Sequence, residues 1–142
     1  MSLKIIHTAD WHLGQTFFGY DRDEEHEAFL SWLIDILTLR QTDVLLIAGD
    51  VFDVANPSAA AQRRFFRFLR EANRHNPQLQ IVIIAGNHDS AARLEAPIPL
   101  LEELNTSIVG VVPRTDLCKI DFDSLLIPLY NKEGKREAIC LA

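Results

Sequence analysis

Residues 79–89 read LQIVIIAGNHD, an apolar run followed at once by a glycine turn and polar residues. Two earlier stretches have the same layout: residues 3–8 precede Asp10-Trp11-His12, and residues 44–48 precede GDVFD at 49–53. Continuous runs of Ile, Leu and Val are typical of strands that are covered on both faces. We therefore expect three buried strands, the third ending at Ala85, whose polar turns converge at one edge of one sheet.

Two long helices are expected between these strands. Apolar residues spaced as on one helix face follow a stretch at residues 21–24 that resembles a capping box, and they predict a helix over residues 22–40. Asn56 and Pro57 supply a cap and a first-turn proline for a second helix, which ends near Asn73. The order is that of a βαβαβ unit, so the fold class is α/β with parallel strands and ligands at their carboxyl ends.

The pattern changes after the third strand. A short helix is expected over residues 97–104, and several β-like runs follow it, over residues 107–112, 117–120, 124–129 and 137–142. These runs predict the beginning of a second sheet. Because the last run ends without a turn or a polar tail, we expect residues 1–142 to be the amino-terminal part of a single longer domain.

Four polar residues at the three turns have the chemistry of metal ligands. Asp10 and His12 lie two apart where the first strand ends, so in extended geometry their side chains point to the same side and can hold one cation. Asp50 comes from a neighbouring strand about 5 Å away and can bridge to a second cation, to which Asn87 offers an amide oxygen. This donor set suits Mn²⁺, with Fe²⁺, Zn²⁺ and Mg²⁺ as alternatives.

Such a pair of ions, about 3.5–4 Å apart, can hold a phosphodiester and activate a water molecule for its hydrolysis. The leaving oxygen then needs an acid, and His88 is the candidate because an imidazole titrates near neutral pH. Asp89 could orient His88 or satisfy the backbone of the turn. Asp53 is expected to stabilise its own turn rather than to reach the site. Each fragment alone is common in ordinary loops, but three in order after buried strands predict a metal site.

Composition limits the classes of protein. Fourteen basic against twenty acidic residues give a net charge of −6, which argues against a polybasic surface but not against phosphate chemistry, because bound metal ions supply positive charge locally. The sequence has neither a long uncharged apolar stretch nor a leader pattern, so we expect a soluble, cytoplasmic protein. Cys118 and Cys140 are expected to be unpaired, reduced thiols.

The order Asp-x-His, Gly-Asp-x-x-Asp and Gly-Asn-His-Asp resembles the calcineurin-like metallophosphoesterase superfamily. Residues 7–14, 48–53 and 85–90, which read HTADWHLG, AGDVFD and AGNHDS, are most similar to those of its DNA-repair nucleases. The resemblance implies the βαβαβ half of a β-sandwich flanked by helices, truncated before the second sheet is complete. It also implies a homodimeric, Mn²⁺-dependent DNA exonuclease and endonuclease that acts in repair and recombination with an ATPase subunit.

For the site, the resemblance implies Asp10, His12, Asp50 and Asn87 as ligands of two metal ions, and His88 as the catalytic histidine. The family completes this site with later Gly-His and Gly-His-x-His motifs, but this sequence has no histidine after His88. We therefore expect the chain alone to retain metal weakly and to show little or no turnover. Two other functions remain open: a phosphoesterase acting on small phosphate esters, and a non-catalytic dimerisation or docking fragment.

Several other residues have simpler explanations than function. His7 and His26 are expected to be hydrogen-bonded packing residues. Trp11 either packs behind the site or lines the substrate path. Phe66 marks either a subunit interface or a wide buried face. The second long helix carries an arginine stripe that is expected to face solvent rather than to contact DNA; it is made up of Arg63, Arg67, Arg70 and Arg74.

Overall fold

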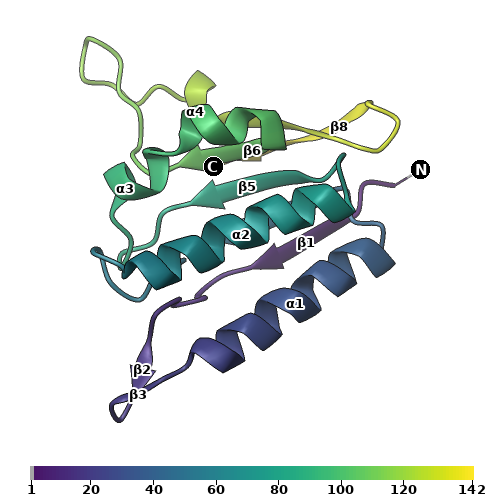
Figure 1. Cartoon of the computed structure of the whole chain (residues 1–142). Helices are drawn as coiled ribbons and strands as arrows, with labels where there is room; N and C mark the ends of the chain where they lie inside the picture. The colour runs from purple at the N-terminus through teal and green to yellow at the C-terminus, as the bar shows by residue number, and fades with distance from the viewer. Residues whose placement is uncertain (1) are drawn as a thin grey trace.

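The computed structural model describes residues 2–142. Its centre is a four-stranded parallel sheet in the order β1-β4-β5-β6, and the strands are β1 (Ile5–Thr8), β4 (Val44–Ala48), β5 (Gln80–Ile84) and β6 (Thr106–Val109). The long helices α1 (Asp23–Leu39) and α2 (Ala59–His75) lie side by side along the sheet (Figure 1). The α/β class, the parallel strands and the two long helices predicted from the sequence are confirmed.

Alternate residues of the central strands bury opposite faces of the sheet, because successive side chains of a strand point to opposite sides. Leu45 and Ile47 of β4 belong to the same apolar core as the helix residues Leu33 and Phe65. On the other face, a second cluster joins the sheet to the antiparallel hairpin of β7 (Leu126–Tyr130) and β8 (Arg136–Leu141), and contains Val44, Val82, Ile127 and Leu129. The protein is therefore layered as helices, parallel sheet and hairpin.

The first strand differs from this pattern. β1 has a single neighbour, β4, in the part of the sheet that the structure describes. Ile5 keeps 44% of its surface exposed, and His7 is also exposed. The predictions that this strand is covered on both faces and that His7 packs inside are therefore wrong, because only the face that carries Ile6 packs against the core.

The helix starts differ from the predicted ones. The residue before α1 is Arg22, whose side chain makes no capping bond; Asp21 instead accepts a hydrogen bond from the Asp23 backbone N–H at 3.3 Å. Before α2, the Ser58 hydroxyl oxygen accepts the Ala61 N–H at 3.1 Å, so the cap is Ser58 and not Asn56. A serine at this position satisfies one of the free N–H groups of the first turn.

The arginine stripe on α2 is solvated, as predicted. Arg63 is exposed, while Arg67 pairs with Glu27 of α1, and both Arg70 and Arg74 pair with Glu71. Phe66 is partly buried and packs against the main core, which agrees with a wide buried face rather than with a free aromatic.

The region after β5 is only partly as predicted. The run expected to begin a second sheet at residue 107 is β6, the fourth strand of the first sheet. Its crossover consists of short helices that include the expected one, namely α3 (Ala91–Glu95), α4 (Ile98–Leu101) and η1 (Glu102–Leu104). Residues 117–120 form no strand, only a bridge between Arg114 and Ile120. The hairpin β7–β8, preceded by η2 (Asp123–Leu125), is the part of a second layer that was predicted.

Three smaller features complete the description. A hairpin that the sequence did not suggest, β2 (Thr16–Phe17) with β3 (Tyr20–Asp21), follows the first strand. Cys118 and Cys140 are both free, as expected. Within residues 2–142, no helix has the length and apolar character that crossing a membrane requires.

Candidate metal centre

The loop that follows β1 continues alongside the loop that follows β4. The backbone N–H groups of Asp10 and His12 donate to the carbonyls of Gly49 and Asp50, at 3.1 and 3.0 Å, and that of Leu13 donates to the Val51 carbonyl at 2.9 Å. These hydrogen bonds extend the strand pairing past the ends of both strands. They bring together the side chains of two loops that lie far apart in the sequence.

Three of the predicted ligands meet there. The Nε2 atom of His12 lies 3.9 Å from Asp10 Oδ1 and 3.9 Å from Asp50 Oδ2. The ligand atoms of these three residues all lie within 4.8 Å of one another. A cation with bonds of about 2.0–2.2 Å to nitrogen and oxygen donors fits between atoms at this spacing. The donor set and its geometry therefore suit a divalent metal ion.

The backbone places these ligands differently from the prediction. Asp10, His12 and Asp50 have φ angles of 56°, 47° and 50°, so none of them is in extended conformation. The left-handed region is uncommon for residues other than glycine and costs about 1–2 kcal/mol per residue. The sequence was right that Asp10 and His12 approach each other, but wrong that strand alternation brings them together. The contacts with the β4 loop hold this strained backbone in place.

Gly86 allows the β5 loop to approach Asp50 closely. A Cβ atom added at Gly86 would lie 2.1 Å from Asp50 Oδ1 and 2.3 Å from the Asp50 backbone nitrogen. The same Oδ1 accepts the backbone N–H of His88 at 3.0 Å. The glycine is therefore required by the packing of one loop against the other.

Asp89 holds the two loops together. Its Oδ2 atom accepts the backbone N–H groups of Val51 and Gly86, at 3.1 and 2.9 Å, and its Oδ1 atom accepts that of Phe52 at 2.9 Å. Of the two predicted roles for Asp89, the structure shows the one in which it satisfies the backbone.

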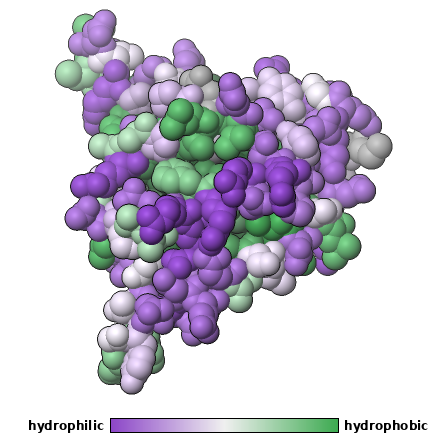
Figure 2. Space-filling view, viewed as in Figure 1, coloured by the Kyte–Doolittle hydropathy of each residue, from purple (hydrophilic) through white to green (hydrophobic). Residues whose placement is uncertain are grey.

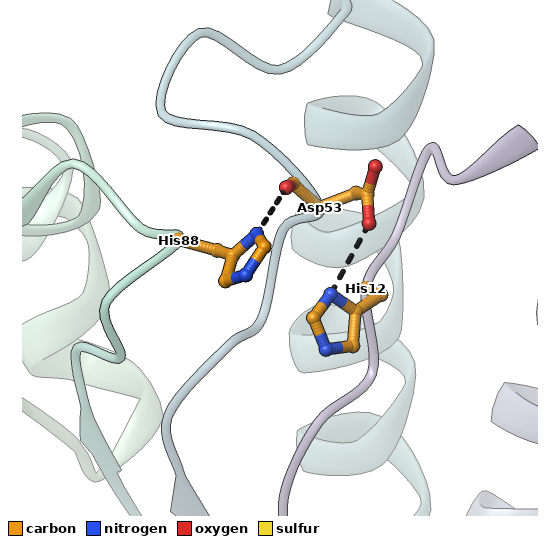
Figure 3. A group of neighbouring side chains, drawn as sticks. All are labelled: His12, Asp53 and His88. Atoms are coloured by element: carbon orange, nitrogen blue, oxygen red, sulfur yellow. Dashed lines mark hydrogen bonds and ion pairs between the residues drawn. The ribbon is translucent and has the colours of Figure 1, made fainter.

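Asp53 and His88 also lie next to His12 (Figure 3). The Nδ1 atom of His88 is 2.7 Å from the Asp53 carbonyl oxygen, and because that oxygen can only accept, Nδ1 carries the proton. The pKa of His88 is raised above its usual value, first by this hydrogen bond and then by the negative charges of Asp50, Asp53 and Asp89. Since the ring is exposed and its raised pKa stabilises the protonated form relative to a free imidazole, His88 has the properties of a general acid.

Asp53 also approaches the metal ligand itself. Its Oδ1 atom lies 3.2 Å from His12 Nδ1, which is buried and makes no aligned hydrogen bond. A metal-bound histidine commonly turns its other ring nitrogen toward a carboxylate, which fixes the orientation of the ring. The expectation that Asp53 serves only its own turn is therefore wrong. Its position three residues after Asp50, in the same loop, was the available signal.

The remaining predicted residues surround this site. Asn87 is exposed in the turn between Gly86 and His88, and its role as a ligand of a second ion stays a prediction. Trp11 packs behind the site: it is buried, its ring contacts Phe29, Phe65 and Phe68, and its Nε1–H donates to the Thr8 hydroxyl at 3.0 Å.

His26 of α1 is buried as expected, but its Nδ1 has no hydrogen-bond partner in the described part of the chain. The predicted burial of His26 is therefore confirmed, but the prediction that its ring is fully hydrogen-bonded is wrong.

Comparison with known proteins agrees with this geometry. The family model of calcineurin-like phosphoesterases matches residues 3–135. The SbcD component of the nuclease SbcCD from Rhodobacter capsulatus is 49% identical over 140 residues, which cover 99% of this chain and 34% of that protein. Proteins of the same name from Escherichia coli K12 and Bacillus subtilis are 38% and 39% identical, over 84% and 86% of this chain and 33% and 31% of theirs. The chain thus spans about a third of the length of these relatives.

Proposed function

Because the chain belongs to the calcineurin-like phosphoesterase family, we propose that it forms the metal-binding, amino-terminal part of a nuclease domain that hydrolyses DNA phosphodiester bonds. One observation carries this proposal: His12 Nε2 lies 3.9 Å from a carboxylate oxygen of Asp10 and from one of Asp50, at the carboxyl edge of a parallel sheet. The names of the relatives, which are nucleases, support this choice of reaction.

The residues present fit divalent ions, with Mn²⁺ as the proposed metal. Asp10, His12 and Asp50 would hold one ion, while Asp50 and Asn87 would contribute to a second. Bound ions of this kind supply a water of lowered pKa and neutralise charge on the phosphate. The family's later histidine motifs lie outside this sequence, so the chain alone is proposed to retain metal weakly.

The remaining chemistry belongs to His88. Its Nδ1–H is held by the Asp53 carbonyl, so the ring is oriented before substrate arrives. When protonated, the ring also carries a proton on Nε2, and we propose that this proton passes to the leaving oxygen of the phosphodiester. An oriented acid avoids the entropic cost of ordering the ring during the reaction.

The names of the relatives and the family resemblance support a proposal for the partners of the whole protein. We propose that it acts with an SbcC-type ATPase, as a homodimer in the cytoplasm, in DNA repair, recombination and replication. Exonuclease and endonuclease activities are both proposed, as the resemblance implies.

Cleavage by a full-length protein containing these residues tests the proposal. We expect Mn²⁺-dependent cleavage of a DNA hairpin and no comparable hydrolysis of p-nitrophenyl phosphate. Asp50→Asn should reduce cleavage to background, because it removes the charge shared between the two ion sites, whereas the exposed Asp116→Asn should leave it unchanged. Hydrolysis of p-nitrophenyl phosphate without cleavage of the hairpin would contradict a nuclease and assign the protein to small phosphate esters.

A further inference from the structure

The hairpin β2–β3 carries three aromatic side chains that the fold does not bury. Phe17, Phe18 and Tyr20 are 64%, 88% and 79% exposed. Figure 1 shows the hairpin projecting beyond the carboxyl end of β1, and Figure 2 shows apolar atoms at the end of the protrusion at the bottom of the view. Large apolar side chains gathered in this way on a projecting element mark an interaction site.

The backbone of the tip is also unfavourable for an aromatic residue. Phe18 and Gly19, at the centre of the turn, have φ angles of 50° and 83°. Two-residue hairpin loops commonly need positive φ at both central positions, and Asn, Asp or Gly usually occupy them. A bulky residue in this region is an outlier whose strain must be compensated elsewhere. The ring of Phe18 packs in edge-to-face geometry on Phe17, with centroids 4.7 Å apart, so the pair presents a preformed aromatic surface.

The hairpin is fixed to the metal centre at its base. The backbone N–H of Gln15 donates to the carbonyl of the metal ligand His12 at 3.0 Å. The Gln15 side-chain oxygen accepts a hydrogen bond from Arg22 at 2.7 Å, which ties the two ends of the hairpin together. A strand of substrate held at the metal centre would therefore pass beside an arm of defined position.

The charge around the hairpin limits what it can bind. Acidic side chains surround its carboxyl end, at Asp21, Asp23, Glu24 and Glu25. They oppose a contact with phosphate groups, so the attraction at the tip has to come from the stacking of a base on an aromatic ring, which depends on the π-face and tolerates any sequence. Bases inside a duplex are already stacked on each other, so unpaired bases are the ones available.

We propose that Phe17, Phe18 and Tyr20 stack against unpaired nucleobases of the DNA strand held at the metal centre. This inference rests on the proposed function for the identity of its ligand.

Equilibrium binding in EDTA tests the inference without cleavage. The probes are a short oligothymidylate and an oligomer of abasic deoxyribose phosphates of the same length, added to the full-length protein. We expect Phe18→Ala and Tyr20→Ala each to weaken oligothymidylate binding about tenfold and to leave the weaker binding of the abasic oligomer unchanged, since alanine removes the stacking surface alone. The matched control is Leu117→Ala, because Leu117 is 79% exposed but lies on a different segment.

Two further variants separate stacking from a general defect. Phe18→Tyr keeps the ring and should keep the affinity. Phe18→Trp places a fluorescent ring at the tip, and we expect oligothymidylate to quench the added emission while the abasic oligomer does not.

Three results would overturn the inference: equal affinity for both oligomers, alanine variants that bind as the parent does, or variants that lose self-association or the ATPase subunit while keeping DNA affinity. The last would assign the hairpin to a protein partner. Base-dependent binding in a protein that never cleaves DNA would instead overturn the proposed nuclease function and leave the hairpin's role standing.

Discussion

The loops that follow β4 and β5, the inner loops, hold each other through side-chain carboxylates, whereas the loop that follows β1 is joined to the β4 loop mainly through its backbone and leaves the Asp10 carboxylate open to solvent. Asp89 accepts hydrogen bonds from backbone groups of both inner loops, and Asp50 accepts one from His88. In contrast, the Asp10 side chain keeps 72% of its surface exposed, and its strand has one neighbour among the described strands.

This difference shows that the site is preorganised unevenly. The inner loops fix Asp50 before any ion binds, so little conformational freedom remains to be lost there on binding. Asp10 still has to be ordered. We therefore expect substitutions in the inner loops to reduce the stability of the fold. Substitutions on the β1 side should mainly alter metal binding or the pH dependence of stability.

The largest expected effect is that of Gly86→Ala. The new methyl group would lie 2.1 Å from Asp50 Oδ1 and 2.3 Å from its backbone nitrogen, and the backbone cannot move without breaking the contacts of Asp89. We expect the free energy of unfolding to fall by about 4 kcal/mol or more, measured by urea denaturation.

Gly134→Ala is the matched control for this variant. Gly134 has a φ angle of 73°, but nothing lies within 4 Å of an added Cβ atom. Its substitution should cost only the backbone strain of about 1 kcal/mol. Gly86 itself is not in the left-handed region, so equal losses for the two variants would mean that the loops give way to the methyl group and that their close approach does not require a glycine.

The next effect in size is that of Asp89→Ala. It removes the acceptor of three backbone N–H groups, and those of Val51 and Phe52 belong to buried residues. We expect a loss of about 3 kcal/mol, because unsatisfied buried donors keep their full desolvation cost. Asp89→Asn, which retains one oxygen, should lose about half as much. A loss below about 0.5 kcal/mol, the range of the exposed Asp116→Ala, would contradict the role of Asp89 in joining the loops.

The same contrast explains what the sequence could predict. The apolar runs identified β1, β4 and β5, and the polar residues after them identified Asp10, His12 and Asp50 as neighbours, because parallel strands end at one edge. The left-handed backbone of these residues could not be predicted. It depends on hydrogen bonds such as that from Asp10 to Gly49, whose partners are distant in sequence.

Other differences have a similar origin. The apolar pattern of residues 107–112 fits a strand of the parallel sheet as well as one of the β7–β8 layer. The crossover through α3 and α4 places β6 beside β5. The contact of Asp53 with His12 depends on how two loops pack, which no local pattern records. Sequence patterns therefore predicted which residues gather, but not how their backbones and partners hold them.

Asp53→Asn tests the link between the two halves of the site. The carboxylate lies 3.2 Å from His12 Nδ1, and its charge favours the ring orientation that turns Nε2 toward Asp10 and Asp50. We expect Mn²⁺ affinity, measured by electron paramagnetic resonance in the full-length protein, to fall about 10-fold to 100-fold, with little change in the urea midpoint. Asp116→Asn serves as the control. Unchanged affinity would show that His12 needs no orienting partner.

The smallest effect concerns His26, which lies in α1 close to the β1 loop. Burial lowers the pKa of His26 from its usual value near 6.5, and the positive charges of Arg22 and Arg64 lower it further. The fold therefore favours the neutral ring. As the pH falls through about 6.5, the unfolded chain takes up a proton that the folded chain does not, so His26 contributes its full stability above this pH and loses it below.

His26→Gln should remove this part of the pH dependence. We expect the variant to lose about 1 kcal/mol at a pH of about 7.5, from imperfect packing of the buried side chain, and to lose less than the parent when the pH is lowered to about 5.5. Urea denaturation at both values measures the difference. His75→Gln, at an exposed position, should keep the parental dependence. If His26→Gln also keeps it, the acid sensitivity of the protein comes from groups other than His26.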